Sequence, residues 1–211
     1  MAQQNFLQQF QLMVEELETH AMIELVKCEF NSPAPKEQLN SFQENFHLTA
    51  TITDFYGQAN GLEICWQKRE ERELSGGGLA AGYINLLPIE EVFQDWHDII
   101  YFDDDDKYKP LHPIDFFVEE ACAALYLNGS SNPQVYYHYL GEEMSSLNVD
   151  FEGYLQLLLK SRGFWYWHKA VAQPEYVNPY APVSLEERNF REIMPQLFPD
   201  FKQSDFKRVE Q

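Results

Sequence analysis

The segment from Tyr56 to Trp66 constrains the fold of this chain most strongly. Asn60-Gly61 is typical of a left-handed turn after a helix, so we expect a short helix to stop near Tyr56. In Leu62–Trp66, apolar residues alternate with a glutamate and a cysteine, which predicts a strand with one buried face. A helix that leads through a tight turn into a half-buried strand is typical of a protein that combines helices with an antiparallel sheet.

Further runs contain β-branched, aromatic and other apolar residues at the density expected of short strands. They cover Tyr83–Leu87, Ile99–Phe102, Ile114–Phe117, Ala121–Leu127 and Val135–Leu140. Together with Leu62–Trp66 they predict a mainly antiparallel sheet of about five to six strands. Ser75–Gly78 is expected to be a flexible connection inside the first pair of strands, and Asn128–Pro133 is expected to join the last pair.

Helices are expected on either side of this sheet. A first helix is predicted from an apolar stripe at spacings of three and four, formed by Leu7, Phe10, Val14, Leu17, Ala21 and Leu25. Further helices are predicted over Lys36–Phe46, over Ile89–Trp96, and over Phe151–Leu159 after the N-cap residue Asp150. The sequence therefore predicts an α+β fold.

The composition of the chain changes after residue 173, where prolines become frequent. Pro174, Pro179 and Pro182 predict an extended stretch, and Ser184–Glu187 forms a capping box that opens a last helix. We expect this helix to stop before Pro195, because proline interrupts helical hydrogen bonding. The predicted organisation is one domain over residues 1–173 and a proline-bounded C-terminal helical extension over 174–211 that packs on it.

The charge of the chain restricts its partners. The net charge is −19, and such a field repels nucleic acids and anionic membranes. A basic protein partner is favoured, although an acidic surface also serves solubility alone. No basic and apolar leader opens the sequence, and no apolar run approaches the roughly 20 residues of a membrane span. We therefore expect a soluble, cytoplasmic protein.

None of the motifs that carry chemistry is complete. Cys28, Cys65 and Cys122 are isolated, so neither a disulfide framework nor a zinc site is suggested, and reduced thiols in a core are expected. Asp103–Asp106 lacks the glycine and the ligand spacing of a calcium loop. Gly76–Ala81 matches a loose dinucleotide-binding fingerprint, but that fingerprint must open a helix and a predicted strand follows here. We predict no catalytic, cofactor-binding or metal-binding residue.

Acidic and aromatic residues are the candidates for protein binding. Exposed aromatic side chains are frequent anchors at interfaces, and Tyr136–Tyr139 is followed directly by two glutamates. Phe164–Trp167 is a second aromatic run, although alternate residues of either run are expected to be buried. The candidate binding residues are Asp103, Asp104, Asp105, Asp106, Tyr137, Tyr139, Glu142 and Glu143.

Over roughly residues 1–165, the order of these motifs resembles the SUKH superfamily of cell-wall-regulator-like and bacterial immunity proteins (Smi/Knr type). The resemblance rests on the Tyr56–Trp66 turn and strand, the Leu87–Glu91 step from strand to helix, and the Phe151–Leu159 helix. It implies an α+β domain with a mainly antiparallel sheet and a non-enzymatic, protein-binding function. The Asp103–Asp106 loop and the 174–211 extension depart from the family pattern.

The resemblance implies one of two roles. In the first, the chain is an immunity protein that neutralises a basic toxin domain, such as one of the nuclease type, whose phosphate-binding site an acidic inhibitor can occupy. In the second, it is a regulatory or scaffold protein related to cell-wall synthesis or signalling. An unrecognised enzyme is the remaining alternative, and the oligomeric state is left open.

Overall fold

The computed structural model describes residues 5–69, 80–174 and 182–208. Its strands form one antiparallel sheet in which each strand pairs with the next along the chain. They are β1 (Ile23–Phe30), β2 (Leu62–Lys68), β3 (Ala81–Leu86), β4 (Leu111–Val118), β5 (Ala121–Tyr126), β6 (Gln134–Tyr139), β7 (Ser145–Asp150) and the two-residue β8 (Gln173–Pro174). The antiparallel α+β fold is confirmed, with more strands than the sequence predicted.

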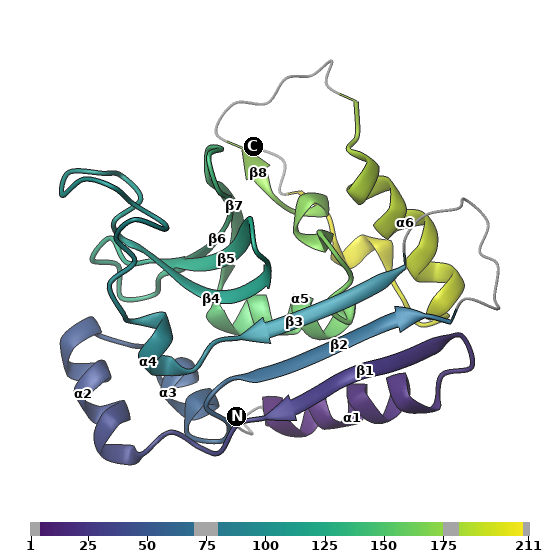
Figure 1. Ribbon diagram of the computed structural model, residues 1–211, viewed down its shortest axis with the longest axis horizontal. Helices are drawn as coiled ribbons and strands as arrows, with labels where there is room; N and C mark the ends of the chain where they lie inside the picture. Colours follow the sequence, from purple (N-terminus) through teal and green to yellow (C-terminus); the bar gives the residue numbers. More distant parts are fainter. Residues whose placement is uncertain (1–4, 70–79, 175–181, 209–211) are drawn as a thin grey trace.

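Helices lie beside and behind the sheet (Figure 1). They are α1 (Phe6–Thr19), α2 (Lys36–Phe46), α3 (Ala50–Tyr56), α4 (Ile89–Val92), α5 (Phe151–Ser161) and α6 (Leu185–Leu197), with 3-10 turns η1 (Trp167–Ala170) and η2 (Gln203–Asp205). In Figure 1, α1 runs along β1, and α5 lies behind the sheet near its centre. The helices predicted over Lys36–Phe46 and after Asp150 are confirmed, and the Asp150 side chain accepts a hydrogen bond from Gly153 N at 2.9 Å.

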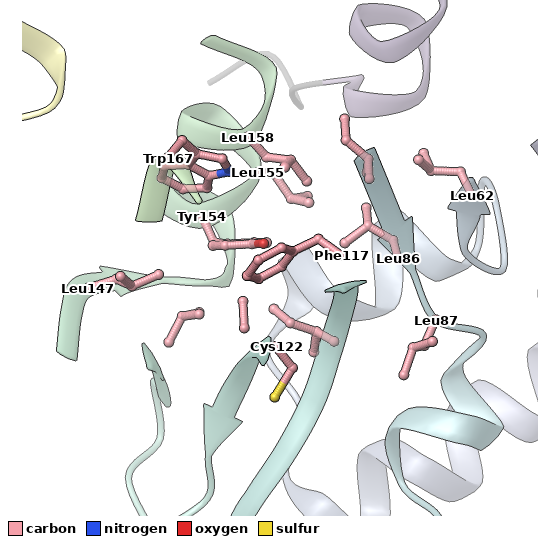
Figure 2. Packing of buried hydrophobic residues seen from close by; sticks show 14 of the residues in the cluster. Leu62, Leu86, Leu87, Phe117, Cys122, Leu147, Tyr154, Leu155, Leu158 and Trp167 are labelled. Carbon is pink, nitrogen blue, oxygen red and sulfur yellow. The ribbon is translucent and has the colours of Figure 1, made fainter. Parts of the chain in front are cut away.

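The core lies between α5 and the sheet. Figure 2 shows Tyr154, Leu155 and Leu158 of α5 opposite Leu86 of β3 and Phe117 of β4, and all five are buried. The predicted alternation over β2 is present, since every second side chain from its first residue is buried up to the tryptophan. Burial of one face of a sheet against an amphipathic helix is the main source of stability in such a fold.

The turn at Asn60-Gly61, which follows α3, is hydrogen-bonded to the segment that leads from β3 into α4. Gly61 has a φ of +85°, and a Cβ there would lie 2.4 Å from the Leu86 carbonyl oxygen, so glycine is required. Asn60 Oδ1 accepts a hydrogen bond from Ile89 N at 2.9 Å, and the Tyr56 hydroxyl donates to the Leu87 carbonyl oxygen at 3.1 Å. The Tyr56–Trp66 motif and the Leu87–Glu91 motif therefore form one structural unit.

The first helix is shorter than predicted. It ends at Thr19, and Leu25 belongs to β1 rather than to the helical stripe. The cause is tertiary pairing: β1 pairs with β2 from Ile23 to Phe30, and that ladder outweighs a helical spacing that continued by coincidence. Cys28 is consequently exposed on this strand, whereas the sequence predicted a core thiol, and Cys122 is buried as expected.

Two predictions between β3 and β4 are wrong. α4 ends at Val92 instead of continuing to Trp96, and Ile99–Phe102 forms turns rather than a strand. Backbone amides of Ile99 and Ile100 both donate to the Trp96 carbonyl oxygen, at 3.2 and 2.9 Å. This local hydrogen bonding replaces a ladder, and it leaves the side chains of Ile99 and Phe102 exposed.

The C-terminal segment begins its helix where predicted and ends it later. Ser184 Oγ accepts a hydrogen bond from Glu187 N at 3.1 Å, as expected of the capping box. Pro195 lies inside α6 instead of ending it, and it cannot donate to the Arg191 carbonyl oxygen. The Gln203 side chain donates to that oxygen at 3.0 Å, which compensates for the missing bond. Buried Phe190 and Met194 attach α6 to the rest of the molecule.

Three further predictions concern residue 174, the connection at Ser75–Gly78 and the proline-containing stretch after residue 173. β8 pairs with β7, so Gln173 and Pro174 lie within the sheet. The expected connection at Ser75–Gly78 and most of the Pro174–Pro182 stretch lie outside the described residues.

Candidate functional site

The loop between α4 and β4 carries the predicted acidic run. Asp103, Asp104 and Asp105 are exposed, and Asp106 is half-buried. Asp106 stabilises the loop, because its carboxylate accepts hydrogen bonds from Tyr108 N at 2.9 Å and from Phe102 N at 3.2 Å. The other three carboxylates are therefore held by a fixed backbone while they face solvent.

The second acidic segment, Glu142-Glu143, lies in the turn between β6 and β7, and the structure joins it to the first. The Lys107 ammonium group pairs with the Glu143 carboxylate. The Tyr108 hydroxyl lies 3.3 Å from Glu143 Oε2 and 3.4 Å from the Glu142 carbonyl oxygen. Residues far apart in the sequence thus form one acidic surface, defined here as Asp103–Asp106 with Glu142 and Glu143.

Lysines offset only part of this charge. Lys109 pairs with Asp104 at 2.7 Å, and Lys107 pairs with Glu143. These hydrogen bonds to lysine lower the pKa values of the Asp104 and Glu143 carboxyls, so both are ionised at neutral pH. Among the described residues, the other three exposed acids of the surface, Asp103, Asp105 and Glu142, form no ion pair.

Apolar side chains border the acidic surface. Phe102 is 62% exposed and Ile99 is 49% exposed, in a molecule whose other large apolar side chains are mostly buried. They line a hollow of about 460 Å³ together with Ile100, Tyr108, His138 and Leu140. Asp98 and Asp106 also line it, so the hollow has an apolar wall and an acidic edge.

His138 is the most buried polar residue of this hollow. It is 2% exposed, its ring lies 4.8 Å from the Tyr108 ring, and its Nδ1 has no hydrogen-bond partner among the described residues. Burial lowers the pKa of His138, which keeps the imidazole neutral at neutral pH. A neutral imidazole retains one donor and one acceptor nitrogen.

The two tyrosines of the predicted site do not lie on this surface as exposed anchors. Tyr137 is 6% exposed, and its ring stacks with Phe117 at 6.3 Å and with His168 at 5.8 Å, so it belongs to the core. Tyr139 is half-buried. Alternation along β6 puts Tyr137 and His138 on opposite sides, and His138 is the one that reaches the acidic loop.

The aromatic run at 164–167 is also mainly structural. Phe164 is 2% exposed and Trp167 is 1% exposed, and the two residues between them are half-buried. Sequence reasoning missed Ile99, Phe102 and Tyr108 as site residues, because the first two were assigned to a strand. Their position beside a run of four aspartates was the available signal, since a strand that ends in such a run is poorly placed for burial.

Within residues 5–69, 80–174 and 182–208, no group of three or more His, Cys, Asp or Glu side chains is arranged to hold a metal ion. No helix of these ranges is both long and apolar enough to cross a bilayer. No protein-family model matches the chain, and no curated protein matches it. The similarity to the SUKH superfamily therefore stays a prediction from motif order.

Proposed function

We propose that this protein is a non-enzymatic binding protein whose acidic surface recognises a basic protein. The observation that carries the proposal is the junction of Asp103–Asp106 with Glu142 and Glu143 through Lys107 and Tyr108. A concentrated negative field on a fixed loop raises the rate of encounter with a basic partner and orients it. Exposed apolar side chains beside it supply area for burial.

The partner that fits best is the basic domain of a toxin, and the protein then acts in the cytoplasm as an immunity protein. Nucleases need positive charge at the site that binds phosphates, and an acidic protein that covers this site blocks the enzyme. The motif order that resembles the SUKH superfamily supports this role. A regulatory partner from cell-wall synthesis or signalling is the alternative, and the identity of the captured protein separates the two.

The test is a pull-down with the tagged protein from its source cells at low salt, followed by a wash at high salt and mass spectrometry. We expect one basic toxin domain that is released by salt, because screening weakens attraction between exposed charges. The informative variant is Asp103→Asn/Asp105→Asn/Glu142→Gln, which removes three exposed charges and leaves the lysine pairs in place. It should recover far less partner.

A matched control removes three exposed charges elsewhere. Glu15→Gln/Glu18→Gln/Glu44→Gln changes the net charge by the same amount on α1 and α2. If this control loses the partner as strongly as the surface variant, net charge and not this surface governs binding. Recovery of a salt-resistant signalling or wall-synthesis protein would favour the regulatory role over immunity.

A further inference from the structure

We infer that the partner carries an apolar side chain flanked by lysine or arginine, and that this side chain fills the hollow beside Ile99 and Phe102. The inference rests on the proposed function and specifies the chemistry of the segment that binds. It follows from three observations: a fixed pair of exposed apolar side chains, a hollow between two loops, and an acidic edge.

The apolar pair is held in position by its own loop. The Phe102 amide donates to Asp106 Oδ2 at 3.2 Å, and His97 Nε2 lies 3.0 Å from the Phe102 carbonyl oxygen. The Ile99 amide donates a hydrogen bond to the Trp96 carbonyl oxygen at 3.2 Å, and the Trp96 side chain is itself buried. An anchor on an already ordered backbone binds at a smaller entropic cost than one on a free loop.

The hollow has the size and lining of a pocket for a side chain. Its volume of about 460 Å³ lies in the lower part of the range of roughly 300–1,000 Å³ typical of ligand pockets. Ile100 and Leu140 line it together with the exposed pair, and Tyr108 connects it to Glu142 and Glu143. Filling it buries apolar surface of both partners, which is the main favourable term in such contacts.

The charge around the hollow selects the flanking residues of the partner. Asp98 and Asp106 line it, and Asp103, Asp105 and Glu142 lie on the loops that border it. A second copy of this chain would bring two such surfaces together at a net charge of −19 each, so self-association is disfavoured. Lysine or arginine on either side of the apolar side chain complements these carboxylates.

The experiment is an amide NMR titration of the full chain with three capped peptides. The first has one tryptophan between two pairs of lysines, the second has serine in place of the tryptophan, and the third has glutamates in place of the lysines. We expect the first to perturb residues 98–108 and 138–142 and to bind at least about tenfold more tightly than the second. We expect no binding of the third. Equal affinity of the first two, perturbation elsewhere, or none at all would overturn the inference.

Variants of the chain separate this inference from the proposed function. Phe102→Ser should weaken the tryptophan peptide by about tenfold and leave the serine peptide unchanged. Leu185→Ser is the control, because Leu185 is also 62% exposed but lies on α6, and it should change neither. Melting temperatures verify that both variants fold.

The natural partner completes the separation. If Phe102→Ser binds it like the wild type while the three-acid variant does not, the acidic surface stands and the apolar pocket is wrong. If neither variant weakens it, the proposed function is wrong as well.

Discussion

Asp115 on β4 is fully buried, whereas Asp103, Asp104 and Asp105 in the loop before that strand are exposed. The Asp115 carboxylate accepts hydrogen bonds from Asn85 N at 2.9 Å and from the Tyr154 hydroxyl at 2.8 Å. Burial raises the pKa of Asp115 to about 6, while the hydrogen bond to Lys109 lowers the pKa of Asp104. The same functional group is thus hydrogen-bonded inside the core in one region and exposed to solvent in the other.

The position of Asp115 explains why the fold holds a carboxylate there. β3 and β4 pair through the single register position Leu86–Asp115, so few backbone hydrogen bonds join them. The Asp115 side chain supplies an acceptor to Asn85 of β3 and also reaches Tyr154 of α5. The Tyr154 hydroxyl lies 3.1 Å from His168 Nε2, which extends the network to η1. One buried carboxylate therefore links four elements.

The largest expected effect is on the stability of Asp115→Ala. The substitution removes the acceptor of the Asn85 amide, leaves His168 Nε2 as the remaining partner of the Tyr154 hydroxyl, and opens a cavity, so we expect a loss of about 4 kcal/mol in the free energy of unfolding. Urea denaturation measures it. Asp104→Ala, at an exposed position, should leave the same quantity nearly unchanged. Similar losses for the two would contradict the contrast between buried and exposed carboxylates.

The second effect is the pH dependence of stability. The folded state keeps the Asp115 proton up to a pKa of about 6, whereas the unfolded chain loses it near the ordinary value of 3.8, so the folded state binds more protons in this window. The contribution of Asp115 is fully present below pH 3.8 and is lost as the pH rises through 6. The loss is about 3 kcal/mol, at about 1.4 kcal/mol per pH unit.

Asp115→Asn isolates this term, because asparagine does not titrate and both proteins retain His168. Burial lowers the pKa of His168 well below its usual value, so His168 acts in the opposite direction as the pH falls. We expect the stability of the wild type relative to Asp115→Asn to fall between pH 4 and pH 7 (about the window given by the two pKa values). A difference that stays constant with pH would show that Asp115 titrates normally.

The same contrast applies to cations. The Arg162 side chain is 10% exposed, bonds to Glu16 at 3.1 Å and Asp200 at 2.9 Å, and lies 4.7 Å from the centre of the Phe198 ring. It connects α1 to the segment after α6. Arg162→Ala should therefore cost about 2 kcal/mol of unfolding free energy by thermal or urea denaturation. An effect as small as that of a surface lysine would mean that the buried cation is not a structural link.

The sequence predicted the regular parts of this fold and missed the parts set by long-range contacts. The alternation in β2 and the caps of α5 and α6 are local signals, and each is present. β1 was hidden in a helical spacing, and β7 (Ser145–Asp150) contains too few apolar residues to be recognised. For the site, both acidic segments were predicted, but their junction depends on Tyr108, whose neighbours come from another turn. Asp115 lies within the predicted strand Ile114–Phe117 but was not singled out, because its partners Asn85 and Tyr154 come from other elements.

The smallest effect on stability, and an increase in binding, is expected for Lys107→Gln. Lys107 is half-exposed and pairs with the exposed Glu143, so its removal should leave the free energy of unfolding nearly unchanged. It also removes a positive charge from the acidic surface, and association with a basic partner should become about twofold faster at low salt. Stopped-flow or surface plasmon resonance measures the rate, and Lys36→Gln, an exposed lysine on α2, is the control. Slower association of Lys107→Gln would mean that the partner contacts Lys107 or the geometry of its ion pair instead of the free carboxylates. The exposed carboxylates near Lys107, unlike the buried carboxylate of Asp115, are not part of the core. Lys107→Gln should therefore alter binding and leave the fold unchanged.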